Sequence, residues 1–187
     1  MGDMVIYDVF DISLIREYLI QNGEAVRFRR GECFYSRGDV ARNIAVLKEG
    51  AFSFSQYDYK GREQILSMAF PGELIGAYIA SQPGQRSMFD VRALCHSTAY
   101  CASLNECREY MDSCLPEGYR RHFAEAIAYG FLVRAVSFRC DSPEQRYYEL
   151  LRREPHIHTM MTNTVIASYL GISREAFARL RAKNNNI

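Results

Sequence analysis

The sequence predicts an α+β protein in which an antiparallel β-roll or jelly-roll barrel is followed by a long helix and a small all-helical module. Short alternating apolar runs separated by glycines fill residues 25–104, which is typical of a barrel or sandwich. Residues 117–139 contain no proline, and residues 162–183 have the pattern of two short helices joined by a glycine. The predicted parts have the bounds 1–115, 116–140 and 141–187.

Composition and charge exclude several classes of protein. Hydrophobic residues make up 48% of the 187 residues, enough for a packed core, so the chain is not of the disordered class. A formal net charge of +1 excludes a uniformly basic nucleic-acid coat but allows a local basic patch. The N-terminal residues lack the pattern of a secretory signal, and no stretch reaches the ~20 apolar residues of a membrane helix. We therefore expect a cytoplasmic protein without membrane contact.

The cysteines form no CxxC pair. They are Cys33, Cys95, Cys101, Cys107, Cys114 and Cys140. In a cytoplasmic chain this usage favours reduced, mostly buried thiols, with a redox-sensing pair or an iron–sulfur site as the alternatives. The first cysteine, Cys33, stands alone, which argues against a cluster.

The elements of the barrel zone follow from glycine and apolar spacing. A short amphipathic helix is expected at residues 8–22, ended by Asn22 and Gly23. Beyond it, each alternating run is short enough for one strand and is bounded by turn residues. Strands are expected at residues 26–28, 33–35, 44–47, 52–54, 64–70 and 91–104.

Helical patterns fill the rest of the chain. We expect a short helix from a cap at Asn105 through Ser113, then a long helix at residues 117–139. One stripe of the long helix carries Phe123, Ile127, Phe131, Arg134 and Phe138, and the adjacent stripe carries Ala126, Gly130, Val133 and Ser137. A helix this apolar needs a packing partner, which is either its own barrel or a second copy of the chain. We favour the second copy, and the helix can contact both partners at once. Ser142, Pro143 and Gln145 form a capping box that starts the next helix.

The strongest functional pattern runs from Thr162 to Lys183. Thr162 is a good helix cap, Gly171 falls where a tight turn must break the helix, and Ser173 caps the second helix. Phe177 and other apolar residues then face inward. Two short helices, a glycine turn and an interlocked apolar corner form the helix-turn-helix pattern.

The outward face of the second predicted helix carries Arg174, Glu175, Ala178, Arg179 and Lys183. Arginine can bond guanine through two hydrogen bonds, and glutamate can accept from the cytosine amino group. Arg181, Lys183 and Asn163 could bind phosphates. An ordinary solvated face is the alternative, because these residue types abound on helices. It does not explain why the cap, the glycine and the corner fall in register with them, so the segment indicates DNA binding.

The motif Ser173-Arg174-Glu175-x-x-x-Arg179 resembles the recognition-helix motif of the Crp–Fnr family of bacterial transcription regulators, and the resemblance spans residues 12–183. It implies a cyclic nucleotide-binding-like sensor barrel, a dimerisation helix and a helix-turn-helix, with no enzymatic activity. The implied partners are double-stranded DNA, a second copy of the chain, a small-molecule effector and RNA polymerase. It also implies that Arg174, Glu175 and Arg179 read a half-site similar to TGTGA. The other predicted DNA-binding residues are Thr162, Asn163, Ser173 and Lys183.

The barrel zone carries a second feature of that family, a phosphate-binding cassette of the form FxxGExxGE followed by RS. The sequence reads Phe70-Pro71-Gly72-Glu73-Leu74-Ile75-Gly76-Ala77 and then Gly84-Gln85-Arg86-Ser87. A glycine-rich turn exposes backbone N–H groups to an anion, and an arginine with a serine hydroxyl can clamp a phosphate. The candidate effector pocket consists of Gly72, Glu73, Gly76, Arg86 and Ser87.

One departure from that cassette is Ala77, which stands where cyclic-nucleotide binders place the glutamate that holds the ribose 2′-hydroxyl. An unpaired buried hydroxyl costs about 1–3 kcal/mol, so cyclic AMP is not expected. Three interpretations stay open: another anionic or small ligand bound through Arg86, no ligand at all, or a degenerate pocket. Arg86 and Ser87 could equally belong to a solvated loop.

The histidines support no metal site. His156 and His158 lie in a predicted loop without a third ligand, and we interpret them as solvent-exposed or phosphate-adjacent. His96, beside Cys95, could ligate haem, but an isolated histidine is more often structural. A metal enzyme of the cupin kind needs several histidines inside the barrel, where only His96 occurs. No metal or cofactor is predicted. The alternative function is a cyclic-nucleotide-like module that regulates a partner protein without binding DNA.

Overall fold

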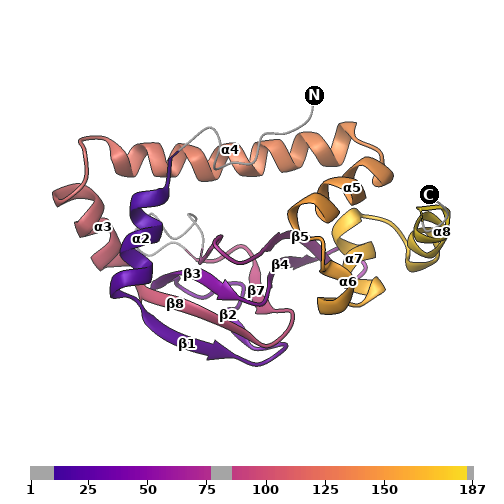
Figure 1. Ribbon diagram of the computed structural model, residues 1–187, viewed down its shortest axis with the longest axis horizontal. Coiled ribbons are helices and arrows are strands. Elements are labelled where there is room, and N and C mark those ends of the chain that lie inside the picture. The colour runs from indigo at the N-terminus through magenta and orange to yellow at the C-terminus, as the bar shows by residue number, and fades with distance from the viewer. Residues whose placement is uncertain (1–10, 77–85, 185–187) are drawn as a thin grey trace.

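Two four-stranded antiparallel sheets form the barrel (Figure 1). The computed structural model describes residues 11–76 and 86–184. One sheet has the strand order β1-β8-β3-β6, and the other has the order β2-β7-β4-β5. The predicted α+β class with an antiparallel roll is confirmed. The strands are Glu24–Phe28 (β1), Cys33–Tyr35 (β2), Asn43–Glu49 (β3), Phe52–Tyr57 (β4), Glu63–Ala69 (β5), Leu74–Ile75 (β6), Asp90–Ala93 (β7) and Ser97–Ser103 (β8).

The barrel core lies between the two sheets and is rich in aromatic rings. Phe28 of one sheet meets Phe52 of the other edge to face, with ring centroids 5.2 Å apart. The middle of β3, from Ile44 to Leu47, is buried at every position. A run of four buried residues is expected where the strand is covered on both faces, here by the opposite sheet and by helices.

The single strand predicted at residues 91–104 is wrong, because the chain changes sheets within it. β7 belongs to the sheet that contains β4, whereas β8 pairs with β1 and β3. At the crossing, the buried Ser97 hydroxyl accepts from the Ala51 N–H at 3.2 Å and donates to the Cys95 carbonyl at 3.1 Å. These bonds satisfy backbone groups that the sheets leave free at this corner.

Three helices cover one side of the barrel (Figure 1). They are α2 (Ser13–Asn22), α3 (Leu104–Ser113) and α4 (Tyr119–Cys140). The predicted end of the first helix at Asn22 and Gly23 is confirmed. The predicted cap at Asn105 is wrong: the N-cap is Ser103, two residues earlier, and the Asn105 side chain accepts from the Arg108 guanidinium at 3.3 Å.

Part of the two predicted stripes of α4 packs inward, whereas Phe138 at the end of one stripe is 47% exposed. Phe123, Ala126 and Gly130 are buried. Phe131 stacks on Phe89, which leads into β7, with ring centroids 6.0 Å apart. These contacts are made within one chain, and pairing with a second copy stays a prediction. The opposite face of α4 remains open, and Leu132 is 58% exposed there.

The C-terminal helical module shares a core with the barrel. Its helices are α5 (Pro143–Arg153), α6 (Ile157–Met160), α7 (Asn163–Leu170) and α8 (Arg174–Asn184). The predicted capping box of Ser142 and Gln145 is confirmed by both of its hydrogen bonds. One buried cluster joins barrel residues to module residues: Ala51, Ile65, Met68, Phe70, Tyr147, Leu150, Ile157, Met161, Ile166, Ala167, Tyr169, Leu170 and Phe177.

Helix α7 lies against β5, the last strand of its sheet. The Ser168 hydroxyl accepts from the Ile65 N–H at 3.1 Å and donates to the Glu63 carbonyl at 3.4 Å. Both backbone groups belong to the edge of β5 that no strand pairs with. Among the described residues, no helix combines the length and apolar character needed to cross a membrane.

Candidate nucleic-acid interface

The corner between α7 and α8 is built as the sequence predicts. The Thr162 hydroxyl accepts from the Val165 N–H at 3.4 Å and caps α7. Gly171 ends α7 in the left-handed region, at a φ of 70°. The Ser173 hydroxyl then accepts from the Ala176 N–H at 3.1 Å, in the first turn of α8. The two caps and the glycine fix the angle at which α8 leaves the corner.

A close contact also requires glycine at position 171. A Cβ atom there would lie 2.2 Å from Cζ of Phe138, near the end of α4. The long helix therefore touches the turn of the helix-turn-helix directly. A larger residue would require the Phe138 ring to move.

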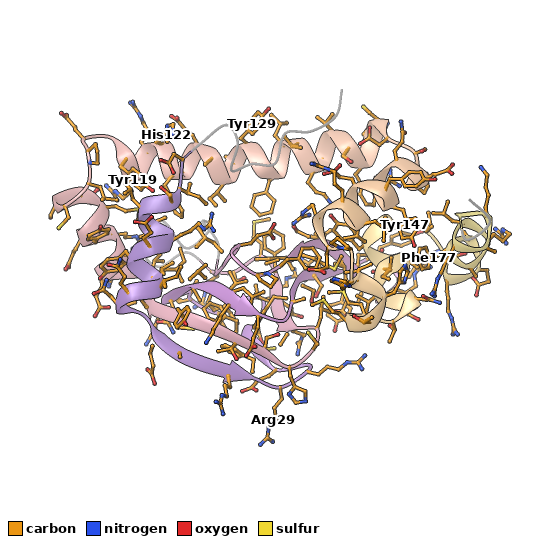
Figure 2. The ribbon with its side chains drawn as sticks, in the orientation of Figure 1. Arg29, Tyr119, His122, Tyr129, Tyr147 and Phe177 are labelled. Atoms are coloured by element: carbon orange, nitrogen blue, oxygen red, sulfur yellow. The ribbon has the colours of Figure 1, made fainter. Side chains whose placement is uncertain are left out.

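Phe177 anchors α8 to the rest of the module. Its side chain is fully buried and meets the Tyr147 ring edge to face at 5.3 Å between centroids (Figure 2). His158 stacks on the other side of the cluster, 6.3 Å from the Phe177 centroid, and its Nε2 is 2.6 Å from the Tyr147 hydroxyl. The interpretation of His158 as a solvent-exposed loop residue is wrong, because this half-buried ring belongs to the module core; His156 is exposed.

The anchored face of α8 leaves the predicted base readers outside. Arg174, Glu175 and Arg179 are all exposed. The pKa of Glu175 is lowered, first by hydrogen bonding to its own backbone N–H, then by the Ser173 hydroxyl and the positive charges of Arg174 and Arg179. The helix therefore presents two cations and one ionised carboxylate on a single surface.

The predicted phosphate contacts flank this surface. The Arg181 guanidinium donates to the Asn163 side-chain oxygen at 3.2 Å, which ties α8 to α7. Lys183 lies 3.6 Å from the Glu144 carboxylate, and its side chain is 70% exposed. The structure thus brings Asn163, Arg181 and Lys183 to the same end of the module as α8.

Two arginines for which no role was predicted hold the module in place. Arg146, 7% exposed, donates to the carbonyl of Leu170 at 2.9 Å and stacks over the Phe138 ring. Arg134 of α4 lies 3.9 Å from the centroid of the Tyr169 ring and donates to the Leu66 carbonyl at 3.1 Å. Burial lowers the pKa of Arg134. The sequence contains one indication of this role, because the charged Arg134 interrupts an otherwise apolar stripe of the long helix.

The candidate effector residues of the barrel are bonded to the chain itself. The Arg86 guanidinium donates to the Gly38 carbonyl at 2.7 Å. The Ser87 hydroxyl donates to the Phe89 carbonyl at 2.6 Å and accepts from the Phe89 N–H at 3.2 Å. Glu73 accepts from the Phe70 N–H at 3.0 Å and ion-pairs with Arg153 at 2.8 Å.

The glycines of the cassette are placed as its turn requires. Gly72 and Gly76 both have positive φ, at 85° and 94°. A Cβ on Gly76 would lie 2.7 Å from the Tyr35 hydroxyl and 2.8 Å from the Asn43 carbonyl oxygen. The departure at Ala77 lies outside the described residues, as do Gly84 and Gln85.

The cysteines and acidic residues assemble no metal site within residues 11–76 and 86–184, where no group of three or more metal-binding side chains occurs. All six cysteines are free thiols. Burial raises the pKa of Cys101 to about 11 and that of Cys107 to about 12, so both stay protonated at neutral pH. Cys107 is buried, Cys33, Cys95 and Cys101 are half-buried, and Cys114 and Cys140 are exposed, so the prediction of mostly buried thiols is wrong.

A two-sheet barrel, a long helix and a helix-turn-helix in this order define a chain with the architecture of the Crp–Fnr regulators. Residues 25–114 match the family model of the cyclic nucleotide-binding domain. Among curated protein sequences, none is significantly similar to this chain.

Solved structures share the fold over most of the chain. FixK2 from Bradyrhizobium japonicum superposes with a TM-score of 0.73 at 16% identity, covering 88% of this chain and 85% of FixK2. The c-di-GMP responsive global regulator CLP of Xanthomonas campestris gives 0.63 at 16% identity, with 93% and 92% covered. A transcriptional regulator of the crp/fnr family from Eubacterium rectale gives 0.61 at 17% identity, with 95% and 84% covered. The predicted resemblance to Crp–Fnr proteins is confirmed at the level of the fold.

Proposed function

We propose that this protein is a homodimeric, sequence-specific DNA-binding transcription regulator of the Crp–Fnr type. The observation that carries the proposal is the corner at Gly171, which buries Phe177 and leaves Arg174, Glu175 and Arg179 exposed on one helix. A helix of this kind fits the major groove of DNA.

The two arginines and the glutamate supply complementary readout. Each guanidinium can donate two parallel hydrogen bonds to a guanine, and the ionised Glu175 can accept from a cytosine amino group. The proposed phosphate-binding residues lie near the ends of α7 and α8: Thr162, Asn163, Ser173, Arg181 and Lys183. Phosphate contacts of this kind fix the register of a helix in the groove. We expect a half-site similar to TGTGA.

The open face of α4 is the proposed dimer contact. On its exposed side Ala128, Leu132 and Ala135 follow one another at spacings of four and three, and Glu125 and Arg139 flank them, so a short apolar stretch lies between two charged positions. Leu132 and Val136 are 58% and 52% exposed on this side, opposite the buried Phe123 and Ala126. A two-fold pairing through this face would present two α8 helices to half-sites about 34 Å apart.

The effector is proposed to be an anionic small molecule held through Arg86 and the Gly72–Gly76 turn. One relative of similar fold is described as responsive to c-di-GMP. Cyclic AMP is not expected, because alanine stands at position 77. RNA polymerase is a further proposed partner, and the cytoplasm the proposed location.

The test is selection of bound genomic fragments by the purified full chain, followed by affinity measurements on the selected duplex. Arg174→Ala and Arg179→Ala should each weaken specific binding by about 1–3 kcal/mol and leave the thermal midpoint unchanged. Arg30→Ala, an exposed arginine in the β1–β2 turn, is the matched control. Selection that enriches no common sequence, or variants that bind the selected duplex like the wild type, would overturn the proposal and favour a module that acts on a partner protein.

A further inference from the structure

An ion pair connects the candidate anion turn of the barrel to the helix-turn-helix. Arg153 is the last residue of α5, and its Nη2 lies 2.8 and 3.0 Å from the two carboxylate oxygens of Glu73. The two side chains are only 23% and 17% exposed. The same guanidinium stacks over the Phe70 ring at 5.2 Å. Because one nitrogen contacts both carboxylate oxygens and the pair is mostly shielded from water, it constrains geometry more than an ordinary surface pair does.

Arg153 also reaches the first helix of the helix-turn-helix. Its Nη1 donates to the Tyr169 hydroxyl at 3.2 Å. The other side of Tyr169 is held by Arg134 of α4, 3.9 Å above the ring. Tyr169 therefore lies where α4, α5 and the barrel turn meet, one residue before the end of α7.

The Glu73 carboxylate is rigidly carried by the barrel. The Glu73 carbonyl accepts from the Leu47 N–H at 2.9 Å, and the Gly72 N–H donates to the Leu47 carbonyl at 2.7 Å. The turn is thereby fastened to β3 in the centre of one sheet. A displacement of Gly72 or Glu73 would reach Arg153 and Tyr169 without an intervening flexible segment.

We propose that the Glu73–Arg153 pair positions the recognition helix, so that both copies of α8 in a dimer meet DNA at one fixed spacing. This proposal rests on the proposed function. Docking by this pair does not mask the base readers, because Arg174 and Arg179 stay exposed and α7 lies between β5 and α8 (Figure 1). Glu73 and Arg153 are positioning residues, which act through α7 and touch no base.

The first test measures docking without DNA. In Glu73→Gln, amide hydrogen exchange at Ile65 and along α7 should accelerate about tenfold, while β3 amides keep their rates. Glu32→Gln is the matched control, because Glu32 accepts from the Arg29 N–H three residues earlier at 2.8 Å, as Glu73 does from Phe70. Unchanged exchange at Ile65 in Glu73→Gln, or equal acceleration in Glu32→Gln, would overturn the proposal.

The second test measures spacing on DNA. The probes are a selected duplex with two half-sites and the same duplex with one half-site scrambled. Glu73→Gln should lower the affinity ratio between them about tenfold and leave single-half-site affinity intact. In an Arg153→Gln background the same change should have no further effect, since the pair is already broken. An unchanged ratio, or additive effects of the two substitutions, would overturn the proposal. Absence of any specific DNA binding by the wild type would instead refute the proposed function, and the exchange test would still stand.

Discussion

At the recognition helix α8, Arg174, Glu175 and Arg179 are exposed, whereas in the barrel cassette Arg86, Ser87 and Glu73 are bonded to their own chain. Both regions hold the residue types that bind anions or polar edges. Only α8 presents them outward from a helix whose other side is fixed by a buried aromatic anchor.

The difference lies in what a ligand must displace. A duplex at α8 would meet exposed side chains, of which Glu175 would exchange its hydrogen bonds to the Ser173 hydroxyl and its own backbone. An anion at Arg86 must compete with the Gly38 carbonyl, and one at Ser87 must compete with both backbone groups of Phe89. Each hydrogen bond that is lost costs about 1 kcal/mol, so the new contacts of a ligand would be offset by the existing contacts that it replaces. Such a site is suited to a switch, since occupancy changes the bonding of the barrel.

The largest effect should come from Gly171→Ala, which tests whether the presenting corner depends on its glycine. The left-handed backbone costs about 1–2 kcal/mol for a residue with a Cβ, and the overlap with Phe138 raises the expected loss of unfolding free energy to about 3 kcal/mol. Chemical denaturation measures it.

The matched control for that corner is Gly61→Ala. Gly61 has a φ of 74°, and an added Cβ meets nothing within 4 Å, so only the backbone cost applies. Equal losses in the two variants would show that the Phe138 contact contributes nothing.

A smaller effect is expected in the cassette. Ser87→Ala removes both bonds to Phe89 and should lower the unfolding free energy by about 1 kcal/mol. Arg86→Ala, at an exposed position, should change it by less than about 0.5 kcal/mol. Thermal and denaturant unfolding of both variants give the comparison. A neutral Ser87→Ala would mean that the cassette is as free for a ligand as the face of α8.

The third prediction concerns pH and the core beneath α8. Burial lowers the pKa of His158 below 6.5 in the folded protein, so the unfolded chain binds more protons as the pH falls. This part of the stability is fully present above pH 6.5 and is lost as the pH falls toward the lowered folded value. His158→Gln should flatten the decline of unfolding free energy between pH 7 and pH 5, and His156→Gln should not. Parallel declines in the wild type and His158→Gln would contradict the assignment.

The smallest effect should appear in the salt dependence of DNA binding. Lys183→Ala should reduce the slope of log affinity against log salt concentration by about 1, because one phosphate contact is lost. Its exposed pair with Glu144 is worth less than about 0.5 kcal/mol, so stability should hardly change. Glu144→Gln should leave the slope as it is. An unchanged slope in Lys183→Ala would remove Lys183 from the phosphate contacts.

Features that depend on neighbouring residues could be predicted from the sequence. Contacts between segments far apart in the chain could not. The caps at Thr162 and Ser142 and the break at Gly171 depend on neighbours within a few residues, and the sequence displays them directly. The change of sheet at residues 94–96 carries no glycine or proline, so one strand was predicted where there are two. The pair of Glu73 with Arg153 joins residues 80 apart, and no periodicity encodes such a contact.

The docking of α7 on β5 has a consequence for the barrel taken alone. A terminal strand with bare N–H and C=O groups is a template for pairing with another chain. Here the Ser168 hydroxyl occupies two of those groups, and α7 covers the strand. The helix-turn-helix therefore also protects this edge strand from pairing with other chains. A fragment that stops after α4 would expose β5, and we expect it to aggregate.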